Sequence, residues 1–121
     1  MAIILLVEDQ ADIREMLTLR LMIEGHEIHE AENGKVGVEM ALKLKPDLIL
    51  TDMHMPVMNG HEEVAILREK GYIGLICAVT ASAMVTDSNR ALTAGCDYCI
   101  TKPIGEDFEA RVAKILEQVN A

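Results

Sequence analysis

The sequence has few aromatic residues and little positive charge. Only three of its 121 residues are aromatic and none is tryptophan, so aliphatic side chains and methionine must fill any core. Lysine and arginine together number 11 against 20 acidic residues, which gives a formal net charge of −9. Because proteins that bind nucleic acids usually carry a basic patch, this balance argues against direct binding of DNA or RNA.

Long hydrophobic segments are missing as well. No apolar run approaches the roughly 20 residues that cross a bilayer. The first run, residues 3–7, is too short for a signal-peptide core and follows no basic region. The three cysteines, Cys77, Cys96 and Cys99, cannot all pair within one chain, which fits a reducing compartment. We therefore expect a cytoplasmic protein that has no membrane segment.

The chain does have enough apolar residues for a core. Half of its residues are hydrophobic, and its length favours one domain over residues 1–121. We find no linker, low-complexity tract or internal repeat. The last predicted helix uses the end of the chain, so we expect no second domain.

Five short apolar runs alternate with five stretches of helical periodicity. The predicted strands are residues 3–7, 26–31, 48–52, 75–80 and 98–101. The predicted helices are residues 11–23, 35–45, 60–70, 84–94 and 106–120. The positions that we expect to face the core are Ile13, Met16, Leu17 and Leu21, then Val64 and Leu67, and finally Phe108, Val112, Ile115, Leu116 and Val119. This alternation predicts an α/β fold with a parallel sheet covered on both faces.

Polar residues stand where four of the predicted strands end. Glu8 and Asp9 follow the first strand, and Asp52 ends the third. Thr80 ends the fourth, and Lys102 follows the fifth. Parallel strands share one carboxyl edge, where open α/β sheets place their sites, so we expect these groups to converge there.

These groups suit phosphoryl transfer to a carboxylate. Asp52 can attack phosphorus and become an aspartyl phosphate. Like charges about 4 Å apart repel by roughly 1 to 4 kcal/mol, so a cation such as Mg²⁺, which prefers oxygen ligands, must sit among the acids. Lys102 would add a second positive charge, and Thr80 would hydrogen-bond a phosphoryl oxygen. The main-chain amides of Met53 and Ala81 would bind the other oxygens.

The chain resembles the receiver domain of two-component response regulators, and its single-domain chemotaxis and cell-cycle members in particular. The matching residues run in the expected order: Val7-Glu8-Asp9, Asn33-Gly34, Pro46-Asp47, Asp52-Met53, Met55-Pro56, Asn59-Gly60, Thr80-Ala81, Gly95 and Lys102-Pro103. The resemblance implies a flavodoxin-like three-layer sandwich with five helices and the strand order 2-1-3-4-5, which spacing alone does not give.

The resemblance also implies roles for the acidic residues. Asp52 would be the phosphorylation site, and Glu8 and Asp9 would be the acidic pair that binds Mg²⁺ with it. The main-chain carbonyl of His54 would be a further metal ligand. The His54 side chain would either tune hydrolysis of the acyl phosphate or be a solvent-facing loop residue with no kinetic role.

The family pattern further implies how a signal passes through the protein. Thr80 would be the switch hydroxyl and Lys102 the phosphate-binding base. A sensor histidine kinase or a histidine phosphotransfer protein would donate the phosphoryl group, and binding of a downstream target protein would give the output. We expect a monomer or weak dimer that acts as a phosphoacceptor in a phosphorelay, with at most slow loss of its own phosphate.

One position departs from the family pattern. Similar proteins carry an aromatic residue three positions before the lysine, where this chain has Cys99, and Tyr98 stands one place earlier. Neighbouring strand residues point to opposite faces, so Tyr98 cannot replace the missing ring unless a bulge shifts the register. The usual coupling of threonine to the aromatic ring is therefore in question.

Two other functions are compatible with an α/β chain of this size. A small aspartate-nucleophile phosphatase usually has a second Asp two residues after the first, where this chain has His54. A flavin-binding flavodoxin should have a first loop rich in Ser, Thr and Gly, whereas residues 8–12 are mostly acidic. Both readings therefore rank below the phosphoacceptor.

Overall fold

Strands and helices alternate along the chain, as the sequence predicts. The computed structural model describes residues 2–53, 58–80, 95–101 and 105–117. Its elements are β1 (Ile3–Val7), α1 (Ala11–Ile23), β2 (Glu27–Ala31), α2 (Gly34–Leu44), β3 (Leu48–Asp52), α3 (Gly60–Glu69), β4 (Leu75–Thr80), β5 (Tyr98–Thr101) and α5 (Phe108–Leu116). The helix predicted at residues 84–94 lies outside the described residues.

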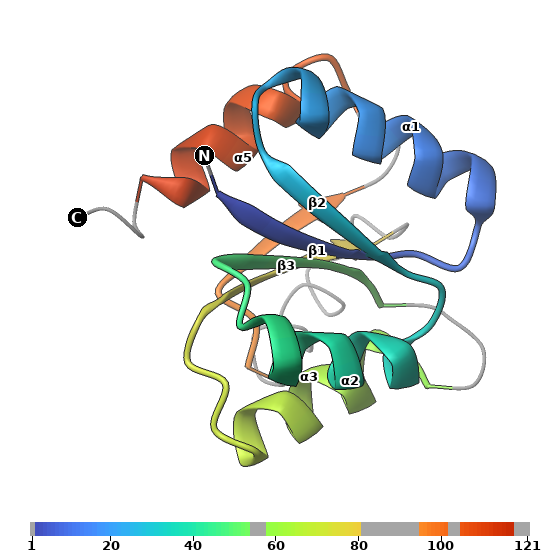
Figure 1. Cartoon of the computed structure of the whole chain (residues 1–121), viewed down its shortest axis with the longest axis vertical. Helices are drawn as coiled ribbons and strands as arrows, with labels where there is room; N and C mark the ends of the chain where they lie inside the picture. The colour runs from blue at the N-terminus through green and yellow to red at the C-terminus, as the bar shows by residue number, and fades with distance from the viewer. Residues whose placement is uncertain (1, 54–57, 81–94, 102–104, 118–121) are drawn as a thin grey trace.

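The five strands form one parallel sheet in the order β2-β1-β3-β4-β5. Helices α2 and α3 cover one face, and α1 and α5 cover the other (Figure 1). These layers and this order confirm the predicted flavodoxin-like α/β sandwich. Because all strands run the same way, their carboxyl ends lie along one edge of the sheet.

Alternate residues of the central strands pack into two separate apolar clusters. The cluster under α2 and α3 includes Leu5, Val7, Ile49, Ile76, Val64 and Leu67. The cluster under α1 and α5 includes Ile4, Leu6, Leu48, Leu50, Leu17, Leu21 and Phe108. Since β1 and β3 are buried on both faces, β1 is apolar throughout and β3 is apolar from Leu48 to Leu50, instead of alternating between apolar and polar residues.

Local signals fix the ends of the two helices on the lower face in Figure 1. Asn33 caps α2 by accepting a hydrogen bond from the Val36 amide at 2.9 Å. Asn59 and Glu62 form a reciprocal capping box at the start of α3. Gly71, with φ of +94°, ends α3 in the left-handed region that favours glycine.

Two expectations about the helices are wrong. Helix α5 begins at Phe108, two residues later than predicted, because residues 106–107 form a turn. Met16 is 43% exposed and faces solvent, whereas Leu17 and Leu21 are buried. Successive helical residues are about 100° apart, so Met16 cannot share the direction of its neighbour Leu17.

Of the helices in the described part of the chain, none combines the length and apolar character that crossing a membrane requires.

Candidate metal centre

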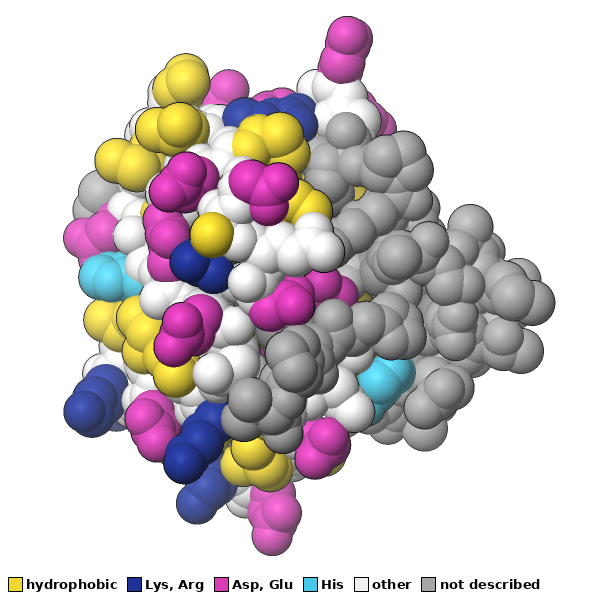
Figure 2. Space-filling model, turned by 90° about the vertical axis from the view of Figure 1, so that its right-hand side faces the viewer, with side chains coloured by type: hydrophobic (Ala, Val, Ile, Leu, Met, Phe, Trp, Pro, Cys, Tyr) yellow, Lys and Arg dark blue, Asp and Glu magenta, His cyan; other side chains and the backbone are white. Residues whose placement is uncertain are grey.

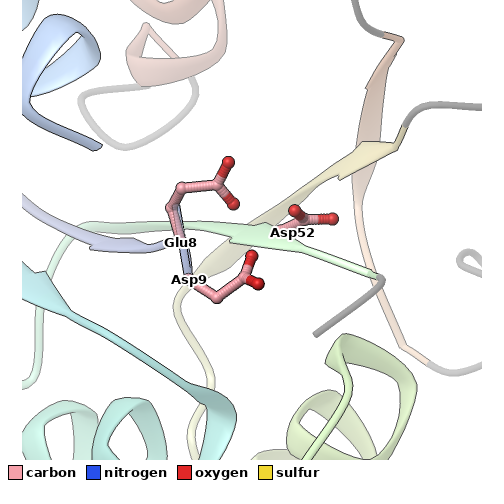
Figure 3. Close-up of side chains that lie close together, drawn as sticks. All are labelled: Glu8, Asp9 and Asp52. Carbon is pink, nitrogen blue, oxygen red and sulfur yellow. The ribbon is translucent and has the colours of Figure 1, made fainter. Parts of the chain in front are cut away.

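Three carboxylates meet at the carboxyl edge of the sheet. Glu8 and Asp9 directly follow β1, and Asp52 is the last residue of β3. One carboxylate oxygen from each lies within 4.8 Å of the other two. Figure 3 shows the three side chains around a common space. Glu8 and Asp52 are nearly inaccessible, with exposures of 2% and 6%.

The sheet and α1 fix the two strand ends that carry these acids. Val7 pairs with Thr51 across β1 and β3, which brings the next residues of both strands to the same level. The Glu8 amide donates to the Ala31 carbonyl of β2 at 3.1 Å. The Arg14 guanidinium of α1 donates to the main-chain oxygen of Glu8 at 2.7 Å. The backbone position of Glu8 is therefore held from two sides.

Helix α3 begins in close contact with the end of β3. The Gly60 amide donates to the Met53 carbonyl at 3.3 Å. A Cβ added at Gly60 would lie 2.5 Å from the Asp52 main-chain oxygen and 2.6 Å from the Met53 sulfur. Real Cβ atoms do not tolerate such contacts, so this position requires glycine. The first turn of α3, where a helix favours negative charge, thus starts beside Asp52.

A buried polar pair, Thr51 and Glu63, connects β3 to α3 beside Asp52, and the sequence pattern does not predict it. Glu63 of α3 is fully buried, and Thr51 Oγ1 hydrogen-bonds its carboxyl group. Burial raises the pKa of Glu63 to about 8, against the smaller lowering effect of the Thr51 hydrogen bond. Position 63 lies on the stripe that also holds Val64 and Leu67, so helical periodicity could have placed it inside.

The donor set fits a hard divalent cation. Three carboxylates offer only oxygen ligands, which Mg²⁺ and Ca²⁺ prefer. Gathering three acidic groups at a mostly buried position is costly unless a cation compensates their charges. Figure 2 shows that, among the described residues of this face, acidic side chains are more numerous than those of lysine and arginine. Glu8, Asp9 and Asp52 would hold the ion.

The structure places the other predicted site residues only in part. Thr80 is the last residue of β4 and pairs with Thr101 of β5 in the sheet. His54, Ala81 and Lys102 lie outside the described residues, as does the side chain of Thr80.

The Met53 amide, predicted to bind a phosphoryl oxygen, is engaged within the sheet. It donates to the Val79 carbonyl of β4 at 3.2 Å. A phosphoryl oxygen would therefore have to share or replace this hydrogen bond.

The residues at the family's aromatic position lie on opposite faces of β5. Tyr98 pairs with Cys77 and Cys99 with Ala78, in continuous register with β4. Tyr98 packs against the cluster under α1 and α5, and Cys99 packs against the cluster under α2 and α3. With no bulge in this register, the Tyr98 ring does not occupy the place of the Cys99 side chain.

Comparison with known proteins gives a family match over nearly the whole chain. The family described as response regulator receiver domain matches residues 4–113. A probable transcriptional regulatory protein of Picosynechococcus is 34% identical over 123 residues, covering 95% of this chain and 49% of that protein. The transcriptional regulatory protein PrrA of Mycobacterium leprae is 31% identical over 119 residues, covering 98% of this chain and 51% of PrrA. The chain spans about half the length of these relatives.

Solved structures agree with this match. The chemotaxis protein CheY4 of Vibrio cholerae is 27% identical with a TM-score of 0.88, and the alignment covers 96% of this chain and 98% of CheY4. A CheY-like receiver domain protein of Methanospirillum hungatei is 26% identical with a TM-score of 0.89, and the alignment covers 98% of this chain and 95% of that protein. A Francisella receiver domain is 21% identical with a TM-score of 0.92, and the alignment covers 98% of this chain and 99% of that domain. At this identity the likeness supports the fold alone. The chain belongs to the response regulator receiver domain family of two-component signalling.

Proposed function

We propose that this chain is a phosphorylation-operated switch whose phosphoacceptor is Asp52. A phosphohistidine on a sensor histidine kinase or phosphotransfer protein would donate the phosphoryl group. An Asp52 carboxylate oxygen would form the new bond to phosphorus while the bond from phosphorus to the imidazole nitrogen breaks. The imidazole keeps the electron pair of that bond, and the product is an aspartyl phosphate.

One observation carries the proposal: a nearly buried aspartate ends a central strand within 4.8 Å of two further carboxylates, in a chain of this family. Bound Mg²⁺ would neutralise the acids and the incoming phosphoryl oxygens. Glu8 and Asp9 would bind the ion together with Asp52, whose other oxygen remains the nucleophile. The His54 carbonyl would be a further ligand.

We infer the remaining roles from the family resemblance, which supports them. Lys102 would bind the phosphoryl group, Thr80 would move toward it as the switch hydroxyl, and the Met53 and Ala81 amides would bind its other oxygens. The added charge would change the surface that a target protein contacts.

The setting of this domain in the cell is part of the proposal. We propose one receiver domain over residues 1–121, with output through binding of a separate protein. The printed names of several relatives describe transcriptional regulators about twice as long, so a receiver joined to another domain is the competing arrangement. The mass of the native gene product distinguishes the two. The cytoplasmic location and the monomeric or weakly dimeric state stay predictions.

The test of Asp52 uses a small phosphodonor such as acetyl phosphate. Wild-type protein with Mg²⁺ should gain one phosphoryl group by intact-protein mass spectrometry, and Asp52→Asn should gain none. Asp107→Asn is the matched control, because Asp107 is an exposed aspartate before α5 whose side chain makes no capping hydrogen bond. Equal phosphorylation of the wild type and Asp52→Asn would contradict the proposal.

A turnover assay tests the alternative of a small phosphatase. A phosphoacceptor should form one aspartyl phosphate per chain and release it slowly, so phosphate esters should not be hydrolysed repeatedly. Release of many equivalents of phosphate within minutes, lost in Asp52→Asn, would favour the enzyme.

A further inference from the structure

A hydrogen-bonded pair connects α3 to the backbone of the phosphoacceptor. Thr51 and Glu63 are both fully buried, and Thr51 Oγ1 hydrogen-bonds Glu63 Oε1. The same hydroxyl lies 3.3 Å from the main-chain oxygen of Asp52. A single hydroxyl group therefore bridges a buried acid on the helix and the last peptide unit of β3.

Among the described residues, no charged group compensates Glu63, because only burial and the Thr51 hydrogen bond shift its pKa. A Cβ at Gly37 of α2 would lie 2.5 Å from Glu63 Oε2 and 2.9 Å from a Val7 methyl of β1, so the carboxyl and the Val7 side chain both approach the backbone of α2 at Gly37. Within the described part of the chain, Glu63 Oε2 makes no hydrogen bond. Gly37, Val7 and Thr51 cannot titrate. The Cys96 thiol, which interacts electrostatically with Glu63, stays protonated near neutral pH because burial raises its pKa to about 12. Burial therefore favours the protonated carboxyl, in line with its pKa of about 8.

Counting hydrogens decides how the pair is arranged. The Thr51 hydroxyl has one hydrogen to donate, and an ionised carboxylate can only accept. If Glu63 were ionised, Thr51 would donate to it, and its contact with Asp52 would join two acceptors. If Glu63 is protonated, it donates to Thr51 Oγ1, and Thr51 donates to the Asp52 carbonyl. Only the protonated acid satisfies both contacts.

We propose that Glu63, Thr51 and the Asp52 carbonyl form a hydrogen-bond relay, with the proton on Glu63, that positions Asp52 for phosphoryl transfer. The inference rests on the proposed function of Asp52. Glu63 is a positioning residue, because it acts through Thr51 and does not contact the phosphoryl group. The relay fixes the end of β3, from which the Asp52 carboxylate reaches Glu8 and Asp9.

Three variants test the relay in the full chain. Glu63→Leu and Thr51→Val each remove one member, whereas Glu63→Gln keeps a neutral donor of nearly the same shape. With acetyl phosphate and Mg²⁺ at pH 7, we expect Glu63→Leu and Thr51→Val to be phosphorylated more slowly. The expected loss is roughly fivefold, the effect of one hydrogen bond on a rate. Glu63→Gln should keep the wild-type rate.

Two further measurements separate positioning from a merely structural role. Urea unfolding should show that Glu63→Leu is at least as stable as the wild type, because leucine replaces a buried polar group by an apolar one. A slower reaction in a stable variant then reflects positioning. The carboxyl-carbon NMR signal of Glu63, assigned by its loss in Glu63→Gln, should show a protonated acid at pH 7 without any phosphodonor.

The possible results distinguish the relay from the proposed function. Wild-type rates in both Glu63→Leu and Thr51→Val, or an ionised Glu63 at pH 7, would overturn the relay and leave Asp52 as phosphoacceptor. If the wild type takes up no phosphoryl group with Mg²⁺, the proposed function fails, and the positioning role fails with it.

Discussion

The hydroxyl of Thr51 contacts the carboxyl of Glu63, a fully buried acid one helical turn into α3. Thr51 precedes Asp52, so the contact links the helix to the strand end that carries the candidate phosphoacceptor. Burying a carboxyl group in an apolar layer is costly unless it is neutral and hydrogen-bonded. This pair therefore makes stability depend on pH in a way that can be measured.

We predict that Glu63 makes the protein less stable as the pH rises from about 5 to 8. Its pKa is about 8 in the folded chain and returns to 4.5 on unfolding, so within this window only the unfolded chain loses the proton. The free energy of unfolding should therefore fall by up to about 1.4 kcal/mol per pH unit relative to Glu63→Gln. Urea unfolding at several pH values measures the difference.

The control for this pH dependence is Glu69→Gln. Glu69 is an exposed residue of the same helix, so its variant should follow the wild-type pH profile. Parallel profiles for the wild type and Glu63→Gln would contradict the neutral, buried acid.

Gly60→Ala should shift the start of α3 away from Asp52 and so change the candidate metal centre. Its Cβ would lie 2.5 Å from the Asp52 main-chain oxygen, so β3 and α3 must separate. Overpacking of this kind typically costs about 1 to 3 kcal/mol. We expect thermal unfolding at a lower temperature and weaker Mg²⁺ binding by calorimetry. Gly105→Ala is the control, because among the described residues its new Cβ would meet Asp107 Oδ1 alone, at 3.1 Å, which is an exposed side-chain atom. Unchanged Mg²⁺ affinity in Gly60→Ala would show that this contact does not shape the site.

Mg²⁺ should stabilise the folded protein through the three carboxylates. An ion that binds only the folded chain adds about 1.4 kcal/mol at ten times its dissociation constant. Thermal unfolding of the wild type should therefore shift upward with Mg²⁺ and return with a chelator. Asp9→Asn should lose most of the shift, whereas Asp107→Asn should keep it. An equal shift in Asp9→Asn would place the ion elsewhere.

Tyr98 should not report phosphorylation as the family's aromatic residue does. Its ring packs against the cluster under α1 and α5, on the face opposite Cys99. NMR spectra recorded before and after phosphorylation should show small changes for the Tyr98 ring and larger ones for Cys99. Tyr98→Leu should be phosphorylated at the wild-type rate. A large change at the Tyr98 ring would show that the strand twists or shifts its register on activation.

The central strands could be predicted because strands that are buried on both faces consist mainly of consecutive apolar residues. Residues 3–7 are apolar throughout, residues 48–52 and 75–80 begin with apolar runs that end in polar residues, and the bounds of all three match β1, β3 and β4. The acids at their ends follow from parallel pairing, which brings Glu8, Asp9 and Asp52 together. The strand order needed the family resemblance, because several orders satisfy the same alternation.

Helical periodicity gave a wrong core position where a helix carries apolar residues on more than one side. Helix α1 exposes Leu19, Met22 and Ile23 as well as Met16, so its sequence does not single out the buried face. The burial of Glu63 was not predicted, because its charge suggests a side chain exposed to solvent. Its position in the sequence nevertheless lies on the inner stripe of α3. Only the contact with Thr51 makes that placement understandable.

Chemical identification of the modified residue shows whether Asp52 is the phosphoacceptor. After phosphorylation with Mg²⁺ and acetyl phosphate, borohydride reduction converts an aspartyl phosphate into homoserine, which peptide mass spectrometry locates. We expect homoserine at position 52, and none when the ion is chelated or in Asp52→Asn. Homoserine at another aspartate, or a phosphoryl group that persists in Asp52→Asn, would contradict it.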